Sequence, residues 1–199
     1  MKKNLYLEKL YNSNKPLIIY KVKDGYDLFT DFSKKIKLNN NNLNIFFKKI
    51  EELKKPSIKK VKDIYIGFFG YRLLCGLINV KKINQRSINF PDGVFYKPET
   101  IIKIRKNITT QSNLKNYQNL FKKQTFTKTN ILTPFNVNLN FEKYKKIFYQ
   151  FSKNIKEGKT YQIKVCTKYS NKSQIDPVIM FWKLMKTNAA SESFMIRDK

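Results

Sequence analysis

Residues 16–29 read PLIIYKVKDGYDLF, and this stretch decides the fold class. An apolar run rich in β-branched residues is followed by a polar turn and then by a second run, which is the pattern of two antiparallel strands joined by a tight connection. Asp24-Gly25 supplies the turn, because glycine adopts backbone conformations that other residues avoid. We therefore expect a β-hairpin near the start of the chain.

Further strand-like runs follow the hairpin and alternate with short helical segments. Residues 45–53 carry apolar side chains at helical spacing, and residues 94–107 read as a strand that follows a Pro91-Asp92-Gly93 turn. The helices are too short and too few for a repeating βαβ fold. The sequence therefore predicts an α+β fold in which mixed or antiparallel sheets pack with helices.

Residues 64–80, IYIGFFGYRLLCGLINV, form the most apolar stretch of the chain. The stretch is at the short limit for a membrane span, and Arg72 at its centre would cost about 2.5–3.5 kcal/mol on an insertion scale. We interpret it as a buried strand over residues 64–71 that leads into a short helix over residues 73–80, and we expect no membrane association.

The composition is strongly basic. Lys and Arg number 41 against 14 Asp and Glu, which gives a net charge of +27, and the chain has no histidine. The missing imidazole excludes histidine bases, histidine-bound zinc and a Ser-His-Asp triad. A nucleic-acid-binding domain is the alternative of another class, because lysines neutralise phosphates. Only four of the basic residues are Arg, the residue that reads base edges, so we expect a solvated basic surface and no specific nucleic-acid partner.

The two cysteines, Cys75 and Cys166, lie far apart in the sequence and form no CxxC motif. Neither a zinc site nor a disulfide framework follows from this spacing, and we expect both thiols to be buried and reduced. The first residues, MKKNLYLEK, do not begin a signal peptide, so the expected compartment is the cytoplasm.

Residues 140–194 are predicted to form a helix, a strand and a second helix, in that order. Asn140 is placed to cap a helix whose aromatic stripe includes Phe141, Tyr144 and Phe148, and Gly158 follows its end. Residues 160–169, TYQIKVCTKY, alternate as a half-buried strand does. Asp176-Pro177 then opens a second helix, which contains Trp182. We assign the aromatic stripe and Trp182 to core packing.

This unit resembles the anthranilate synthase and para-aminobenzoate (aminodeoxychorismate) synthase component I family of chorismate-utilising enzymes. The matching residues are Ile155-Lys156-Glu157-Gly158, Tyr161-Gln162-Ile163, Lys168-Tyr169, Asp176-Pro177 and Asn188-Ala189. Upstream, residues 67–73, GFFGYRL, and residues 90–96, FPDGVFY, are similar to segments of the family's N-terminal domain. The resemblance implies an N-terminal domain over residues 1–135 and the start of a chorismate-binding catalytic domain over residues 136–199. Family chains are about twice as long, so the chain is expected to be an N-terminal fragment of such an enzyme fold.

The resemblance also implies an activity. Family members aminate chorismate with Mg²⁺ and with ammonia from a glutamine amidotransferase subunit, in folate or tryptophan biosynthesis. The expected parent is component I of aminodeoxychorismate synthase, with anthranilate synthase as the alternative. The resemblance implies that the magnesium ligands lie in the missing C-terminal half. In this chain, Glu51-Glu52, Glu142 and Glu157 lack the spacing of a metal site. The fragment alone is expected to be inactive.

Gln162 and Lys164 are the candidate site residues. Gln162 aligns with the position at which isochorismate-forming relatives carry a lysine base; its neutral amide cannot act as a base but can orient ammonia. Lys164, expected on the same strand face, can pair with a carboxylate of chorismate. The alternatives, a structural polar residue at 162 and a solvated lysine at 164, stay open at this point.

Overall fold

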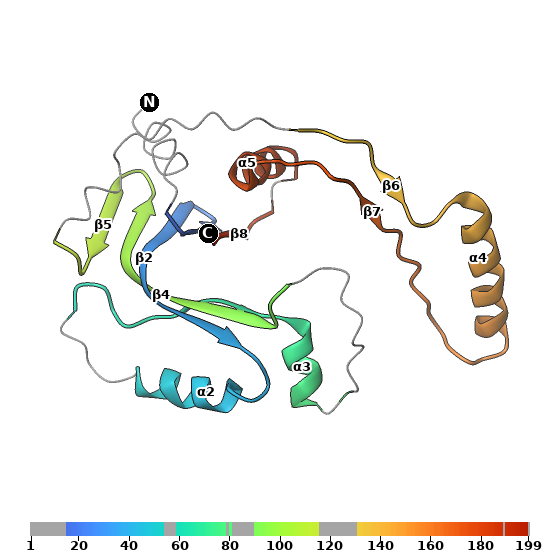
Figure 1. Cartoon of the computed structure of the whole chain (residues 1–199), viewed down its shortest axis with the longest axis horizontal. Helices are drawn as coiled ribbons and strands as arrows, with labels where there is room; N and C mark the ends of the chain where they lie inside the picture. Colours follow the sequence, from blue (N-terminus) through green and yellow to red (C-terminus); the bar gives the residue numbers. More distant parts are fainter. Residues whose placement is uncertain are drawn as a thin grey trace. The chain divides into compact units, whose positions relative to one another are not determined.

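The computed structural model describes residues 15–53, 59–78, 80, 90–115, 131–188 and 190–198 and has an α+β architecture (Figure 1). Its elements are, in chain order, β1 (Leu17–Val22), β2 (Gly25–Leu38), α2 (Leu43–Glu52), β3 (Ile66–Phe69), α3 (Tyr71–Leu77), β4 (Gly93–Ile104), β5 (Ile108–Ser112), β6 (Asn136–Val137), α4 (Phe141–Lys156), β7 (Tyr169–Ser170), α5 (Pro177–Thr187) and β8 (Ser193–Arg197). All the strand pairings described are antiparallel, which confirms the predicted fold class.

The chain divides into two compact units. The first comprises Met1–Phe126 and Phe181–Lys199, and the second Thr127–Met180. The C-terminal strand belongs to the first unit because β8 pairs with β1, as Leu17 lies opposite Arg197 in the ladder. The predicted boundary between residues 135 and 136 concerns functional domains and stays a prediction.

The sheet of the first unit has the order β3-β4-β2-β1-β8, and β5 pairs with β4. Its centre is the predicted hairpin: β1 and β2 pair from Leu17 opposite Thr30 to Val22 opposite Gly25, so Lys23 and Asp24 alone form the connection. Two-residue connections of this kind match the twist of antiparallel strands. The hairpin prediction is confirmed.

A bulge interrupts the long pairing of β2 with β4. The register shifts between Phe32 and Lys34, and Asp31, directly before it, has a φ of 53°. This left-handed conformation is rare in non-glycine residues, although aspartate tolerates it better than most. The Asp31 carboxylate accepts a hydrogen bond of 2.8 Å from the buried Thr100 hydroxyl and lies 3.3 Å from the Lys15 amine. These contacts stabilise the bent strand.

Two apolar clusters of described residues contribute to the core of the sheet. One joins α2 and α3 to the sheet through five buried side chains: Leu38, Leu43, Phe46, Leu73 and Phe95. The other lies where β1, β2 and β4 meet and has four buried members: Ile18, Phe29, Val94 and Tyr96. The Phe46 ring lies 4.7 Å from the Phe95 ring, centroid to centroid, which fixes α2 against β4.

Residues 64–80 contain a strand followed by a helix, as the sequence predicts, but β3 covers only Ile66–Phe69 and α3 covers Tyr71–Leu77. The prediction that the strand is buried is wrong, because no residue of β3 is fully buried and Phe69 is exposed. Arg72 lies at the start of α3, where its Nε is 3.2 Å from an Asp92 carboxylate oxygen. Among the residues that the structure describes, no helix combines the length and the apolarity needed to cross a bilayer. The expectation for the cysteines is half wrong: Cys75 is buried in α3, but Cys166 is exposed, because it lies in a segment outside any strand.

Candidate functional site

The candidate residues follow α4, whose ends the sequence specifies locally. The Asn140 side chain accepts a hydrogen bond of 3.0 Å from the Lys143 amide, which caps the helix as predicted. After the last turn, Gly158 has a φ of 68°, the left-handed conformation for which glycine is the best residue. Lys159 then forms an ion pair of 2.7 Å with Glu157. These contacts set the direction in which the chain leaves α4.

The segment after this turn differs from the prediction. Residues 160–169 were expected to form a half-buried strand, but 161–168 have no regular structure and only Tyr169–Ser170 pairs, with Asn136–Val137. The reason is physical: a strand needs a hydrogen-bonded neighbour, and among the described residues only the two of β6 are opposite β7. One further anchor is the Asn138 side chain, which accepts a hydrogen bond of 2.6 Å from the Lys168 amide.

Gln162 and Lys164 lie in this segment, and the structure exposes both side chains to solvent. Exposure alternates over residues 162–166, because Ile163 and Val165 are half-buried whereas Gln162, Lys164 and Cys166 are exposed. The expected period of two does not extend further, because Tyr161 and Thr167 are exposed as well. An amide and an ammonium two residues apart on one side can contact the same small anion.

The aromatic stripe of α4 is a second departure from the prediction. The side chains of Phe141, Tyr144 and Phe148 are 72%, 41% and 50% exposed, so they are not core residues here. Among its described residues the second unit comprises little besides α4, the short β6–β7 pair and the start of α5, and α4 has no buried residue. Trp182, in contrast, is partly buried, with its ring 5.0 Å from that of Tyr26.

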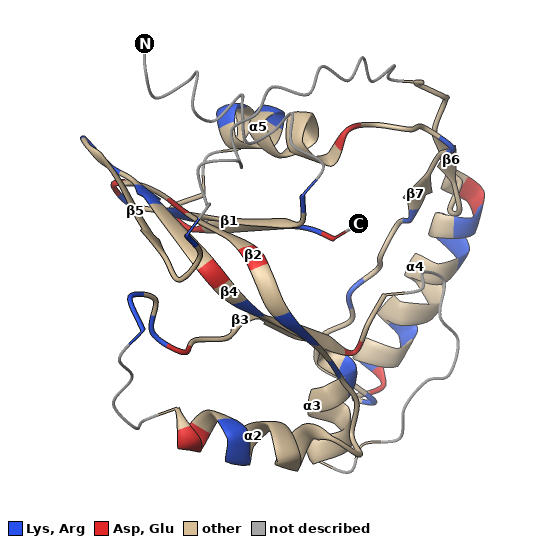
Figure 2. Ribbon diagram, turned by 60° about the vertical axis from the view of Figure 1, so that its left-hand side comes forward, with Lys and Arg blue, Asp and Glu red and all other residues tan. Residues whose placement is uncertain are grey.

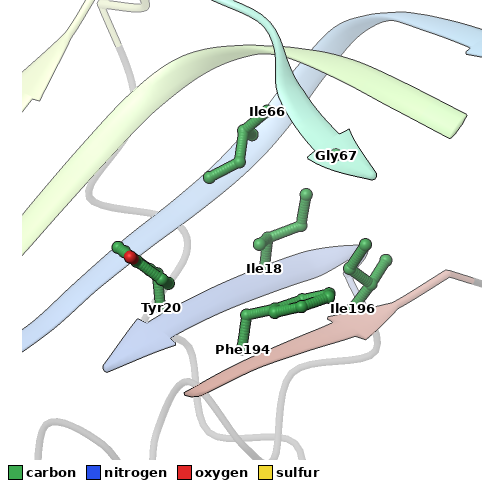
Figure 3. A pocket seen from close by; sticks show the side chains of 6 residues that line it. All are labelled: Ile18, Tyr20, Ile66, Gly67, Phe194 and Ile196. Carbon is green, nitrogen blue, oxygen red and sulfur yellow. The ribbon is translucent and has the colours of Figure 1, made fainter. Parts of the chain in front are cut away.

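The first unit carries an apolar cavity of about 220 Å³ on one face of its sheet (Figure 3). Three strands line it, with the residues Ile18, Tyr20, Ile66, Gly67, Phe194 and Ile196. A Cβ atom at position 67 would lie 1.9 Å from the Val94 carbonyl oxygen, so only glycine permits β3 to approach β4 this closely. The sequence did not predict this cavity, because it forms only when residues near 18 and near 195 become neighbours through the β1–β8 pairing.

A second cavity, of about 360 Å³, has a charged lining that includes Lys35, Lys37, Tyr96 and Asp198. Lys35 forms an ion pair with Asp198. Burial, together with the hydrogen bond to Asp198, raises the pKa of the Tyr96 hydroxyl above its ordinary value, so the group is a neutral hydrogen-bonding partner at physiological pH. This cavity can accept small polar groups, and no sequence motif indicated it.

The described residues do not fit a magnesium site. No group of three or more acidic or cysteine side chains lies together in the described part of the chain. Some of its carboxylates are paired with cations instead: Asp27 lies 2.7 Å from Arg105 and Asp63 lies 2.6 Å from Lys97. A carboxylate neutralised in this way is a poor ligand for a second cation.

The basic residues in the described part of the chain lie on several different elements. Lys and Arg occur on the strands and on α2, α4 and α5 (Figure 2). A nucleic-acid-binding domain requires a basic patch or stripe on one face. The expectation of no specific nucleic-acid partner stays a prediction.

Comparison with known protein families gives one match. The model of the family described as chorismate binding enzyme matches residues 6–199, which is nearly the whole chain. A comparison with individual curated proteins found no match. The match covers the sheet of the first unit and the segment with Gln162 and Lys164. The chain belongs to the family of chorismate-binding enzymes.

Proposed function

We propose that this chain is part of a chorismate-aminating synthase, component I of aminodeoxychorismate synthase. The observation that carries the proposal is the family match over residues 6–199, combined with the exposed, alternating placement of Gln162 and Lys164. The residue pattern Tyr161-Gln162-Ile163 favours aminodeoxychorismate over anthranilate as the product, by resemblance to that branch of the family.

The two candidate residues have distinct roles in this proposal. Lys164 pairs with a carboxylate of chorismate, because the substrate is a dianion and an ammonium is its natural partner. Gln162 uses its carboxamide to orient ammonia toward the substrate ring. It transfers no proton, since an amide is neither an acid nor a base near pH 7. The exposure of both side chains leaves their polar groups accessible to a ligand.

The rest of the site is assigned to groups outside the described residues. By the resemblance we place the magnesium ligands beyond this sequence; the described residues hold no group of three or more acidic or cysteine side chains. Ammonia is supplied by a glutamine amidotransferase partner in this proposal. It follows that the 199 residues alone do not aminate chorismate.

Sequencing the gene beyond codon 199 tests this division of the site. An open reading frame that continues for a similar length and contains the acidic metal ligands supports it. Within that continuation, a lysine in the family's Pro-Ile-x-Gly-Thr motif indicates aminodeoxychorismate synthase, and an alanine indicates anthranilate synthase. A stop codon directly after Lys199 overturns the proposal that the missing ligands belong to the same protein.

Variants of the whole encoded protein test the two residues. Lys164→Ala is expected to raise the KM for chorismate about tenfold, the loss of one charge-assisted contact worth about 1.5 kcal/mol. Lys172→Ala is the matched control, an exposed lysine of the same unit, and is expected to leave KM unchanged. Gln162→Leu is expected to lower kcat with ammonia at least about tenfold while KM for chorismate changes little. Equal effects of Lys164→Ala and Lys172→Ala on the KM for chorismate would show that Lys164 does not bind the substrate.

A further inference from the structure

We draw no further inference here: the strongest candidate, the apolar cavity that β1, β3 and β8 line on one face of the sheet, carries none, because nothing in the structure shows what covers that face.

Discussion

Replacing Asp31 by alanine is expected to destabilise the first unit by about 1–2.5 kcal/mol. The substitution removes the acceptor of the 2.8 Å hydrogen bond from Thr100, whose side chain is fully buried, at a cost of about 1 kcal/mol. Alanine must also hold the left-handed conformation, which it tolerates less well than Asp31, so the total destabilisation exceeds the hydrogen-bond loss by up to about 1 kcal/mol. The lost pairing with Lys15, which is half exposed, adds at most about 0.5 kcal/mol. Thr100 keeps Ser112 as a partner, so no larger penalty follows.

Two further variants separate these contributions. Asp31→Asn keeps an oxygen acceptor and tolerates the left-handed conformation, so its expected cost is below about 1 kcal/mol. Asp31→Gly removes the backbone strain but also the hydrogen bond, so its expected destabilisation lies between those of Asp31→Asn and Asp31→Ala. Asp24→Ala, in the exposed turn between β1 and β2, is the control and is expected to lie within about 0.5 kcal/mol of the unaltered chain.

Urea unfolding followed by tryptophan fluorescence measures these differences. Trp182 is the single tryptophan and contacts Tyr26 in the same unit, so its emission reports on the unfolding of this sheet. With a typical slope of about 1–3 kcal/mol per molar urea, Asp31→Ala should lower the midpoint by roughly 1 M. An Asp31→Ala midpoint equal to that of Asp24→Ala, or an Asp31→Asn variant as unstable as Asp31→Ala, would refute the reasoning.

Three other outcomes follow from the structure. The Lys97 amine holds the pKa of Asp63 below its ordinary value, so this pair stabilises the fold above about pH 4. The stabilisation is lost as the pH falls through the lowered pKa. Asp63→Asn should therefore make the free energy of unfolding less dependent on pH in the acid range, and an unchanged dependence would contradict the pairing. Asn140→Ala should speed hydrogen exchange at the Lys143 amide about fivefold, the loss of a cap worth about 1 kcal/mol, whereas Asn44→Ala, exposed on α2, should leave that rate unchanged. Binding to duplex DNA should be weak and disappear by about 0.2 M salt, where screening is effective beyond about 8 Å; sub-micromolar binding at that salt would favour the nucleic-acid alternative.

Local patterns predicted much of the fold. The turn at Asp24-Gly25, the cap at Asn140 and the left-handed Gly158 each depend on residues within one or two turns of the chain, so the sequence around them suffices. Asp176 is a similar case: its carboxylate accepts hydrogen bonds from the amides of Val178 and Ile179, as a residue at the start of a helix does.

Features that depend on distant partners were not predicted. The pairing of β8 with β1 joins residues about 180 positions apart, and the cavity between β1, β3 and β8 exists only through that pairing. Two predictions were wrong: the strand over residues 160–169 and the burial of the aromatic stripe with Phe141. Alternation and amphipathicity indicate which face of a segment can be buried, but they do not show that another segment packs against that face. For the candidate site, the sequence identified Gln162 and Lys164 through a family resemblance and predicted that they share a face, whereas the exposure of both side chains comes from the structure.

The most direct test of the account is product formation by the purified 199-residue chain. The chain is incubated with chorismate, Mg²⁺ and ammonia, and the products are followed by anthranilate fluorescence and by chromatography of aminodeoxychorismate. We expect neither product, because Gln162 and Lys164 lie in a segment whose described surroundings contain no group of metal ligands. Turnover by the chain alone, abolished by Gln162→Leu, would show that the catalytic groups lie within these residues and would contradict the proposed division of the site.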